Sequence, residues 1–123
     1  MQQAKIGRRY HFEAGHWLPK VSEGHKCKRP HGHNYVLDIS IEDQIQNNGF
    51  VIDFWDLDTI VNPIIQIVDH RMLNDLGGLE NPTAENIARW FLNQIMPHFA
   101  HCNLDVRIYE TDKCWATVTY KHP

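Results

Sequence analysis

The sequence contains no apolar run that approaches the roughly 20 residues of a membrane-spanning helix, and it has no excess of positive charge. Its 12 lysine and arginine residues are outnumbered by 15 aspartate and glutamate residues, which gives a net charge of −3 when the histidines are neutral. A membrane protein is therefore not expected. A domain that binds nucleic acid through a broad basic surface is not expected either.

Cysteine is scarce, with three residues in the chain, and the number is odd. With no signal peptide before Lys5, we expect reduced thiols and a cytoplasmic protein. No repeat, low-complexity tract or linker divides the chain. We therefore expect one domain, residues 1–123, which is long enough to bury a core of its own without disulfides.

Histidine is plentiful by contrast, and two segments place three histidines in strands. Residues 5–16 and 31–43 alternate between apolar and polar residues, so side chains two positions apart share one face. His16 ends the apolar face of the first segment, and His31 and His33 begin that of the second. If the two strands pair antiparallel, the three imidazoles converge at one end of the sheet. Three histidines with a fourth position open is the pattern of a catalytic zinc site.

Cys27 lies just before this second strand and has two interpretations. It could be a fourth ligand that closes a structural zinc site, or it could be a reactive thiolate favoured by the cations Lys26, Lys28 and Arg29 beside it. Those cations also allow two interpretations, a solvated loop or a site for an anion.

The rest of the chain predicts two helices followed by two strands. Asp53 is a candidate N-cap for a helix whose apolar positions continue to residue 68, and Pro63 is expected to kink or divide it. A second helix is expected to start near residues 81–83 and to stop before Pro97. Alternating residues then predict strands near 104–110 and 116–120, joined by a turn at 111–113.

Two further features could take part in chemistry. Glu110 ends an otherwise apolar strand face, where a carboxylate needs either a nearby Arg or Lys or a ligand that donates hydrogen bonds to it. Asp69 and His70 are adjacent, a common arrangement on surfaces, but a histidine can also move protons near neutral pH.

Several motifs, in this order along nearly the whole chain, resemble the 6-pyruvoyltetrahydropterin synthase family. The short spacing between the cysteine and the paired histidines is similar to that of the bacterial branch, the 6-carboxytetrahydropterin synthases of queuosine biosynthesis. The motifs are Phe12-x-Ala14-x-His16, Cys27-x-x-x-His31-Gly32-His33, Asp69-His70 with Leu73-Asn74, Glu80-Asn81-Pro82-Thr83-x-Glu85, and Tyr109-Glu110-Thr111.

The resemblance implies an α+β tunnelling fold, with a four-stranded antiparallel sheet, two helices on one face, and oligomerisation into a barrel, expected as a trimer-based hexamer. It implies zinc on His16, His31 and His33, and 7,8-dihydroneopterin triphosphate as substrate. The remaining roles that it implies are Cys27 as general base, Asp69 and His70 as a proton relay, and Glu110 as the pterin anchor. The charges of Lys26, Lys28 and Arg29 make them candidates for triphosphate contacts.

The expected reaction is a lyase reaction that leaves 6-carboxytetrahydropterin and releases acetaldehyde and triphosphate. One alternative is triphosphate elimination to 6-pyruvoyltetrahydropterin. Another is a non-catalytic, zinc-stabilised oligomeric module in which Cys27 completes the metal site. A zinc deaminase is disfavoured because its His-x-Glu and Pro-Cys-x-x-Cys motifs are missing.

Overall fold

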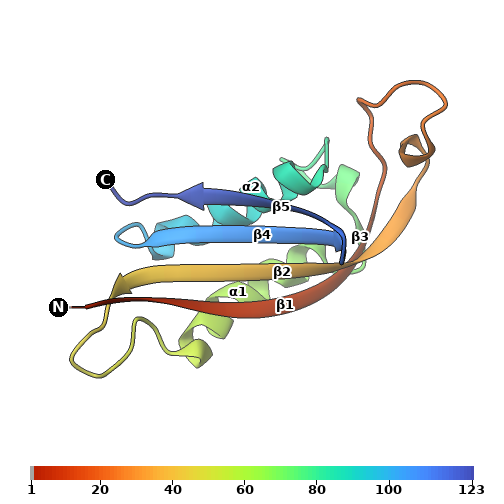
Figure 1. The fold of residues 1–123 in the computed structure, drawn as a ribbon. Helices are drawn as coiled ribbons and strands as arrows, with labels where there is room; N and C mark the ends of the chain where they lie inside the picture. Colours follow the sequence, from red (N-terminus) through yellow and green to blue (C-terminus); the bar gives the residue numbers. More distant parts are fainter. Residues whose placement is uncertain (1) are drawn as a thin grey trace.

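The computed structural model describes residues 2–123, which form one mixed sheet with two helices on one face (Figure 1). The strands lie side by side in the order β3-β1-β2-β4-β5. No helix within residues 2–123 is long and apolar enough to cross a membrane. The elements are β1 (Gln3–His16), β2 (His31–Gln44), α1 (Phe54–Val68), β3 (Arg71–Met72), α2 (Ala84–Ile95), β4 (Asn103–Thr111) and β5 (Cys114–Tyr120), with short 3-10 helices at Lys26–Lys28, Leu73–Asp75 and Met96–His98.

The predicted antiparallel pair of β1 and β2 is confirmed, and its register runs without interruption from Gln3 opposite Gln44 to His16 opposite His31. Alternate residues of both strands face the helices and are buried, including Phe12, Tyr35 and Leu37. A one-residue slip would turn every one of these side chains to the other face. The apolar pattern thus selects the register that brings the histidines together.

The predicted four-stranded antiparallel sheet is corrected to five strands, because β3 adds a short parallel pairing to β1 at Ala14 and Gly15. His70 has a positive φ of 58°, and its N–H donates to the carbonyl of Glu13 at 2.6 Å. That turn directs Arg71 and Met72 alongside β1. A strand of two residues is too short to show an alternating pattern, so sequence periodicity could not reveal it.

Both helices begin as predicted, at side chains that accept hydrogen bonds from the first turn. Asp53 accepts from the N–H of Trp55, and Thr83 accepts from the N–H of Asn86. Pro63 does not end α1, which continues to Val68. Pro63 lies on the exposed side of the helix, as does Thr59, whose carbonyl loses its usual amide partner but remains accessible to solvent.

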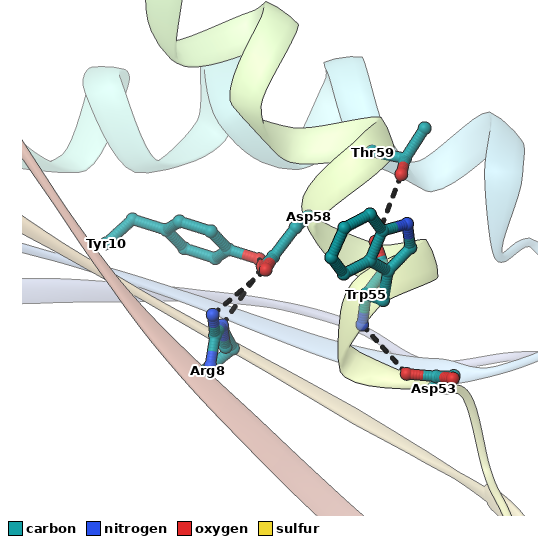
Figure 2. Close-up of polar contacts among 6 residues, drawn as sticks. All are labelled: Arg8, Tyr10, Asp53, Trp55, Asp58 and Thr59. Carbon is teal, nitrogen blue, oxygen red and sulfur yellow. Dashed lines mark hydrogen bonds and ion pairs between the residues drawn. The ribbon is translucent and has the colours of Figure 1, made fainter.

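An ion pair joins α1 to β1. Arg8 is a polar residue on the apolar face of β1, and its guanidinium makes two hydrogen bonds to Asp58 on α1, at 3.0 and 2.9 Å. Tyr10 donates its hydroxyl to the same carboxylate at 2.6 Å. Figure 2 shows the three side chains meeting between helix and strand. The network explains why Arg8 can occupy a face that otherwise packs against helices.

Candidate metal and substrate site

The structure brings together His16 from the end of β1 and His31 and His33 from the start of β2. One ring nitrogen from each lies within 4.8 Å of the others, and the ring centroids are 4.5 to 5.1 Å apart. His16 is fully buried, while His31 and His33 are half-buried. The cluster therefore has a buried side and a side that is open to a ligand.

Backbone carbonyls set the orientation of two of these rings. His16 Nδ1 lies 2.8 Å from the carbonyl of Pro82, and His31 Nδ1 lies 2.8 Å from the carbonyl of Arg29. A carbonyl can only accept, so each Nδ1 carries a proton and donates it. In a neutral ring the Nε2 atom then has a free lone pair. Burial lowers the pKa of His16 and of His33, which favours their neutral forms.

These lone pairs point to a cation. The Nε2 atoms of His16 and His31 are 3.0 Å apart, yet neither has a proton to donate to the other. His33 Nε2 is buried without a hydrogen-bond partner among residues 2–123. Two nitrogen ligands on a tetrahedral zinc ion at about 2.0–2.1 Å lie about 3.3 Å from each other, close to the spacing seen here. Carbonyl-backed imidazoles are also typical of zinc ligands. The residues fit a zinc ion.

Glu110 lies beside this cluster at the end of the apolar face of β4, as alternation predicts. The pairing of β4 with β5 shifts between Tyr109 and Thr111, which leaves Glu110 as the extra residue of a β-bulge. Its carboxylate lies 3.6 Å from His33 Nε2. Within residues 2–123, no lysine or arginine forms an ion pair with it. The first of the two explanations for an acid on this face, a cationic partner in the chain, is therefore not observed.

Cys27 is half-buried in the short 3-10 helix before β2. Its carbonyl accepts a hydrogen bond from the N–H of Leu18 at 2.8 Å, which ties the two ends of the 17–30 loop together. Its sulfur does not belong to the group of donor atoms that contains the three imidazoles. This arrangement favours a site with an open position over one closed by Cys27.

The three cations near Cys27 belong to a loop that projects beyond the end of the sheet (Figure 1). Lys28 forms an ion pair within that loop, because its ammonium group lies 2.6 Å from the carboxylate of Glu23. Lys26 and Arg29 are exposed.

Asp69 and His70 form a hydrogen-bonded pair at the β1 edge. His70 Nδ1 lies 3.0 Å from Asp69, and the other ring nitrogen lies 3.2 Å from Glu13. The hydrogen bond with Asp69 raises the pKa of His70, while bonds from the Glu13 N–H and from His70 lower the pKa of Asp69. Glu13 was not among the predicted site residues, because on the polar face of a strand it resembles any surface acid.

A cavity of about 520 Å³ lies beside His70. Glu13, Gly32 and Asn34 line it, and because they alternate with the histidines along β1 and β2, it opens on the face of the sheet opposite the three imidazoles.

The fold and site define an α+β protein with a three-histidine centre, and comparisons with known proteins identify its family. Residues 5–121 match the profile of the 6-pyruvoyl tetrahydropterin synthase family. The chain belongs to this family. A solved structure, Caenorhabditis elegans 6-pyruvoyl tetrahydropterin synthase, superposes with a TM-score of 0.86 at 26% identity, covering 98% of each chain.

Two curated relatives are similar along the sequence. A 6-carboxy-5,6,7,8-tetrahydropterin synthase of Synechocystis is 35% identical over 124 residues, covering 96% of this chain and 93% of its own. A dihydroneopterin monophosphate aldolase of Pyrococcus furiosus is 37% identical over 93 residues, covering 76% of this chain and 75% of its own. Both names refer to pterin compounds, but they name different reactions.

Proposed function

We propose that this chain is a zinc-dependent 6-carboxy-5,6,7,8-tetrahydropterin synthase of queuosine (7-deazaguanine) biosynthesis. It would convert 7,8-dihydroneopterin triphosphate and water to 6-carboxytetrahydropterin, acetaldehyde and triphosphate. The observation that carries the proposal is the convergence of three imidazole nitrogens, two of which have free lone pairs, beside a carboxylate that lacks a cationic partner within residues 2–123. The similarity to the Synechocystis synthase over nearly the full chain supports this choice of reaction.

His16, His31 and His33 would hold the zinc ion. Bound there, zinc supplies Lewis-acid chemistry that makes the hydroxyl groups of the substrate side chain more acidic. The carbonyls of Pro82 and Arg29 keep two of the rings in the tautomer that presents Nε2.

Glu110 would anchor the pterin ring. A carboxylate can accept two parallel hydrogen bonds from the amino-pyrimidine edge of a pterin, in the same fork geometry that a guanidinium offers. This carboxylate lies next to His33, so that an anchored ring would direct its side chain toward the histidines.

Proton transfer would fall to Cys27 and to the Asp69–His70 pair. The Cys27 thiolate would accept a proton from a carbon of the substrate side chain. His70, whose pKa is raised by its hydrogen bond with Asp69, would donate a proton or remove a second one.

The sheet edges support a homo-oligomer. Within residues 2–123, β5 pairs only with β4, and β3 covers only Ala14 and Gly15 of β1, so long stretches at both edges expose unpaired backbone groups. Pairing between copies would satisfy these groups and close sheets into a barrel, with Asp69 and His70 at the junction. The three cysteines are free thiols, as expected of a cytoplasmic enzyme.

Product analysis tests the reaction. Zinc-loaded protein should convert 7,8-dihydroneopterin triphosphate to 6-carboxytetrahydropterin, with acetaldehyde in equal amount. A 6-pyruvoyl product would indicate the sister elimination. The similarity to the Pyrococcus furiosus aldolase favours a second candidate, aldol cleavage of dihydroneopterin monophosphate, so both phosphorylated pterins should be offered side by side. Activity on the monophosphate alone would overturn the synthase assignment.

A further inference from the structure

Tyr35 is a buried phenol whose hydroxyl has no hydrogen-bond partner within residues 2–123. The residue is fully buried on the face of the sheet that packs against the helices, and its ring stacks on Phe12 with the centroids 4.9 Å apart. A phenylalanine would fill the same space, whereas a buried hydroxyl without a partner is unfavourable. Packing alone therefore does not explain why a tyrosine stands at position 35.

Tyr10 shows the more usual arrangement of a buried phenol. It lies on the same face of the sheet, on β1, and its hydroxyl donates to the carboxylate of Asp58 at 2.6 Å. A carboxylate is a strong acceptor for a phenol, because a hydrogen bond to a charged group is stronger than one between neutral groups. The comparison suggests which kind of acceptor would suit Tyr35.

A carboxylate occupies the neighbouring position on β4. The pairing of β2 with β4 extends at this end to Val36 opposite Tyr109, so Tyr35 and Glu110 are the next positions in the register. Both belong to the face that packs against the helices, where the Cβ atoms of opposite residues lie about 4.5–5.5 Å apart. Burial, and then the negative charge of Glu110, raises the pKa of Tyr35, so the phenol remains a protonated donor.

Zinc binding would leave Tyr35 as the buried donor nearest to this carboxylate. Within residues 2–123, the buried side-chain atoms without a partner are His33 Nε2, the Tyr35 hydroxyl and Asn81 Oδ1. The Glu110 carboxylate lies 3.6 Å from His33 Nε2. Once that nitrogen binds zinc, it has no proton to offer to Glu110. Asn81 Oδ1 can only accept, so it cannot serve a carboxylate either.

We propose that the Tyr35 hydroxyl donates a hydrogen bond to Glu110 in the zinc-loaded protein, which makes Tyr35 a positioning residue for the carboxylate that anchors the pterin ring. The inference rests on the proposed function for the zinc ion and for the identity of the ring. An ionised carboxylate has about four lone-pair sites. Glu110 can therefore accept from Tyr35 on one side and from two donors of the ring on the other, and the hydrogen bond fixes the direction in which the anchor points.

Tyr35→Phe tests the proposal, because it removes one oxygen atom and keeps the ring that stacks on Phe12. In metal-free protein the change should not lower the unfolding midpoint, since no hydrogen bond is lost. In zinc-loaded protein it should keep the zinc, lower the midpoint by about 4 °C, and weaken binding of unphosphorylated dihydroneopterin by about 10-fold in titration calorimetry. In a Glu110→Ala background, Tyr35→Phe should have neither effect, because Tyr35 acts through Glu110.

Tyr10→Phe is the matched control, since its oxygen already donates to Asp58. It should lower the unfolding midpoint with and without zinc and leave pterin affinity unchanged.

Two results would overturn the inference while product formation by wild-type protein leaves the proposed function standing. One is a Tyr35→Phe protein that is destabilised without zinc, as Tyr10→Phe is. The other is a Tyr35→Phe protein whose zinc-loaded midpoint and pterin affinity equal those of wild type. Coupling between Tyr35 and Glu110 in zinc-loaded protein that forms no 6-carboxy product would instead overturn the proposed function and keep the hydrogen bond.

Discussion

The two ends of the sheet each gather three potential metal ligands, yet only one end is built like a metal site. At one end stand His16, His31 and His33. At the other, Asp43, His101 and Cys102 also place their donor atoms within 4.8 Å of one another. The difference lies in what those atoms are already bonded to.

At the Asp43 end, the potential metal ligands already contact one another. The Cys102 thiol donates to the Asp43 carboxylate at 3.5 Å, and burial raises the pKa of Cys102 to about 12, which keeps it a thiol. The side chain of His101 is 69% exposed, and its Nε2 lies 3.6 Å from the Asp43 carboxylate. At the histidine end, by contrast, carbonyls occupy the protonated nitrogens and leave lone pairs directed at one space. Ligand orientation and protonation therefore matter more than proximity.

The largest effect should follow removal of a ligand at the histidine end. Purified protein should hold about one zinc ion per chain, and His31→Ala or His33→Ala should lose most of it, because two imidazoles hold zinc far more weakly than three. Elemental analysis gives the ratio, and thermal unfolding should show that the variants still fold, since the core does not depend on the site. Wild-type protein without metal, purified in the absence of chelators, would contradict the assignment.

Cys27→Ala should retain zinc and substrate affinity but lower turnover by about 10²–10⁴-fold, because a thiolate that only accepts a proton contributes to the reaction and not to binding. Single-turnover kinetics alongside metal analysis would measure this. Two results together would contradict the role of Cys27 as a general base: loss of zinc from the variant, and strong thiolate-to-cobalt charge transfer in cobalt-substituted wild-type protein. They would show instead that Cys27 is the fourth ligand of a structural zinc site.

Glu110→Gln should weaken pterin binding by about 2–3 kcal/mol, on the order of 30–100-fold, since one acceptor oxygen becomes a donor that faces a donor. Zinc content should stay constant. Titration calorimetry with an unphosphorylated pterin isolates the ring contact, and Glu85→Gln on the exposed side of α2 serves as the control. Unchanged affinity would show that Glu110 has a structural role only.

Protonation of His70 should respond to its neighbour. Because the hydrogen bond with Asp69 raises the pKa of His70, stabilisation from the pair is complete below the ordinary histidine value of about 6.5 and is lost as the pH rises through the raised pKa. Asp69→Asn should move the titration midpoint of His70 downward in an NMR experiment, whereas Asp75→Asn should not. If the titration midpoint of His70 does not move in Asp69→Asn, the carboxylate of Asp69 does not control the protonation of His70.

The smallest effect is expected at the opposite end of the sheet. Cys102→Ser should leave the zinc content at about one ion per chain, because the thiol there is already bonded to Asp43. Metal analysis after dialysis against micromolar zinc would check this. A second equivalent of zinc that disappears in the variant would show that both ends bind metal.

Strand periodicity predicted the convergence of His16, His31 and His33 correctly, since a period of two places alternate side chains on one face and a continuous apolar pattern permits one register. The cap at Asp53 and the start of the second helix near residues 81–83 followed from local hydrogen-bonding and backbone chemistry. These features depend on neighbours in the sequence or on the alternation of a single strand.

Other features were decided only by the tertiary structure, because they depend on residues far apart in the chain. The carbonyl of Pro82 orients His16 across 66 positions, and Asp58 satisfies Arg8 across 50. The contact between Glu110 and His33 requires the pairing of β2 with β4, and β3 forms only where the chain after α1 lies against β1. Sequence alternation determined which face each side chain occupies; long-range packing decided which atoms that side chain meets.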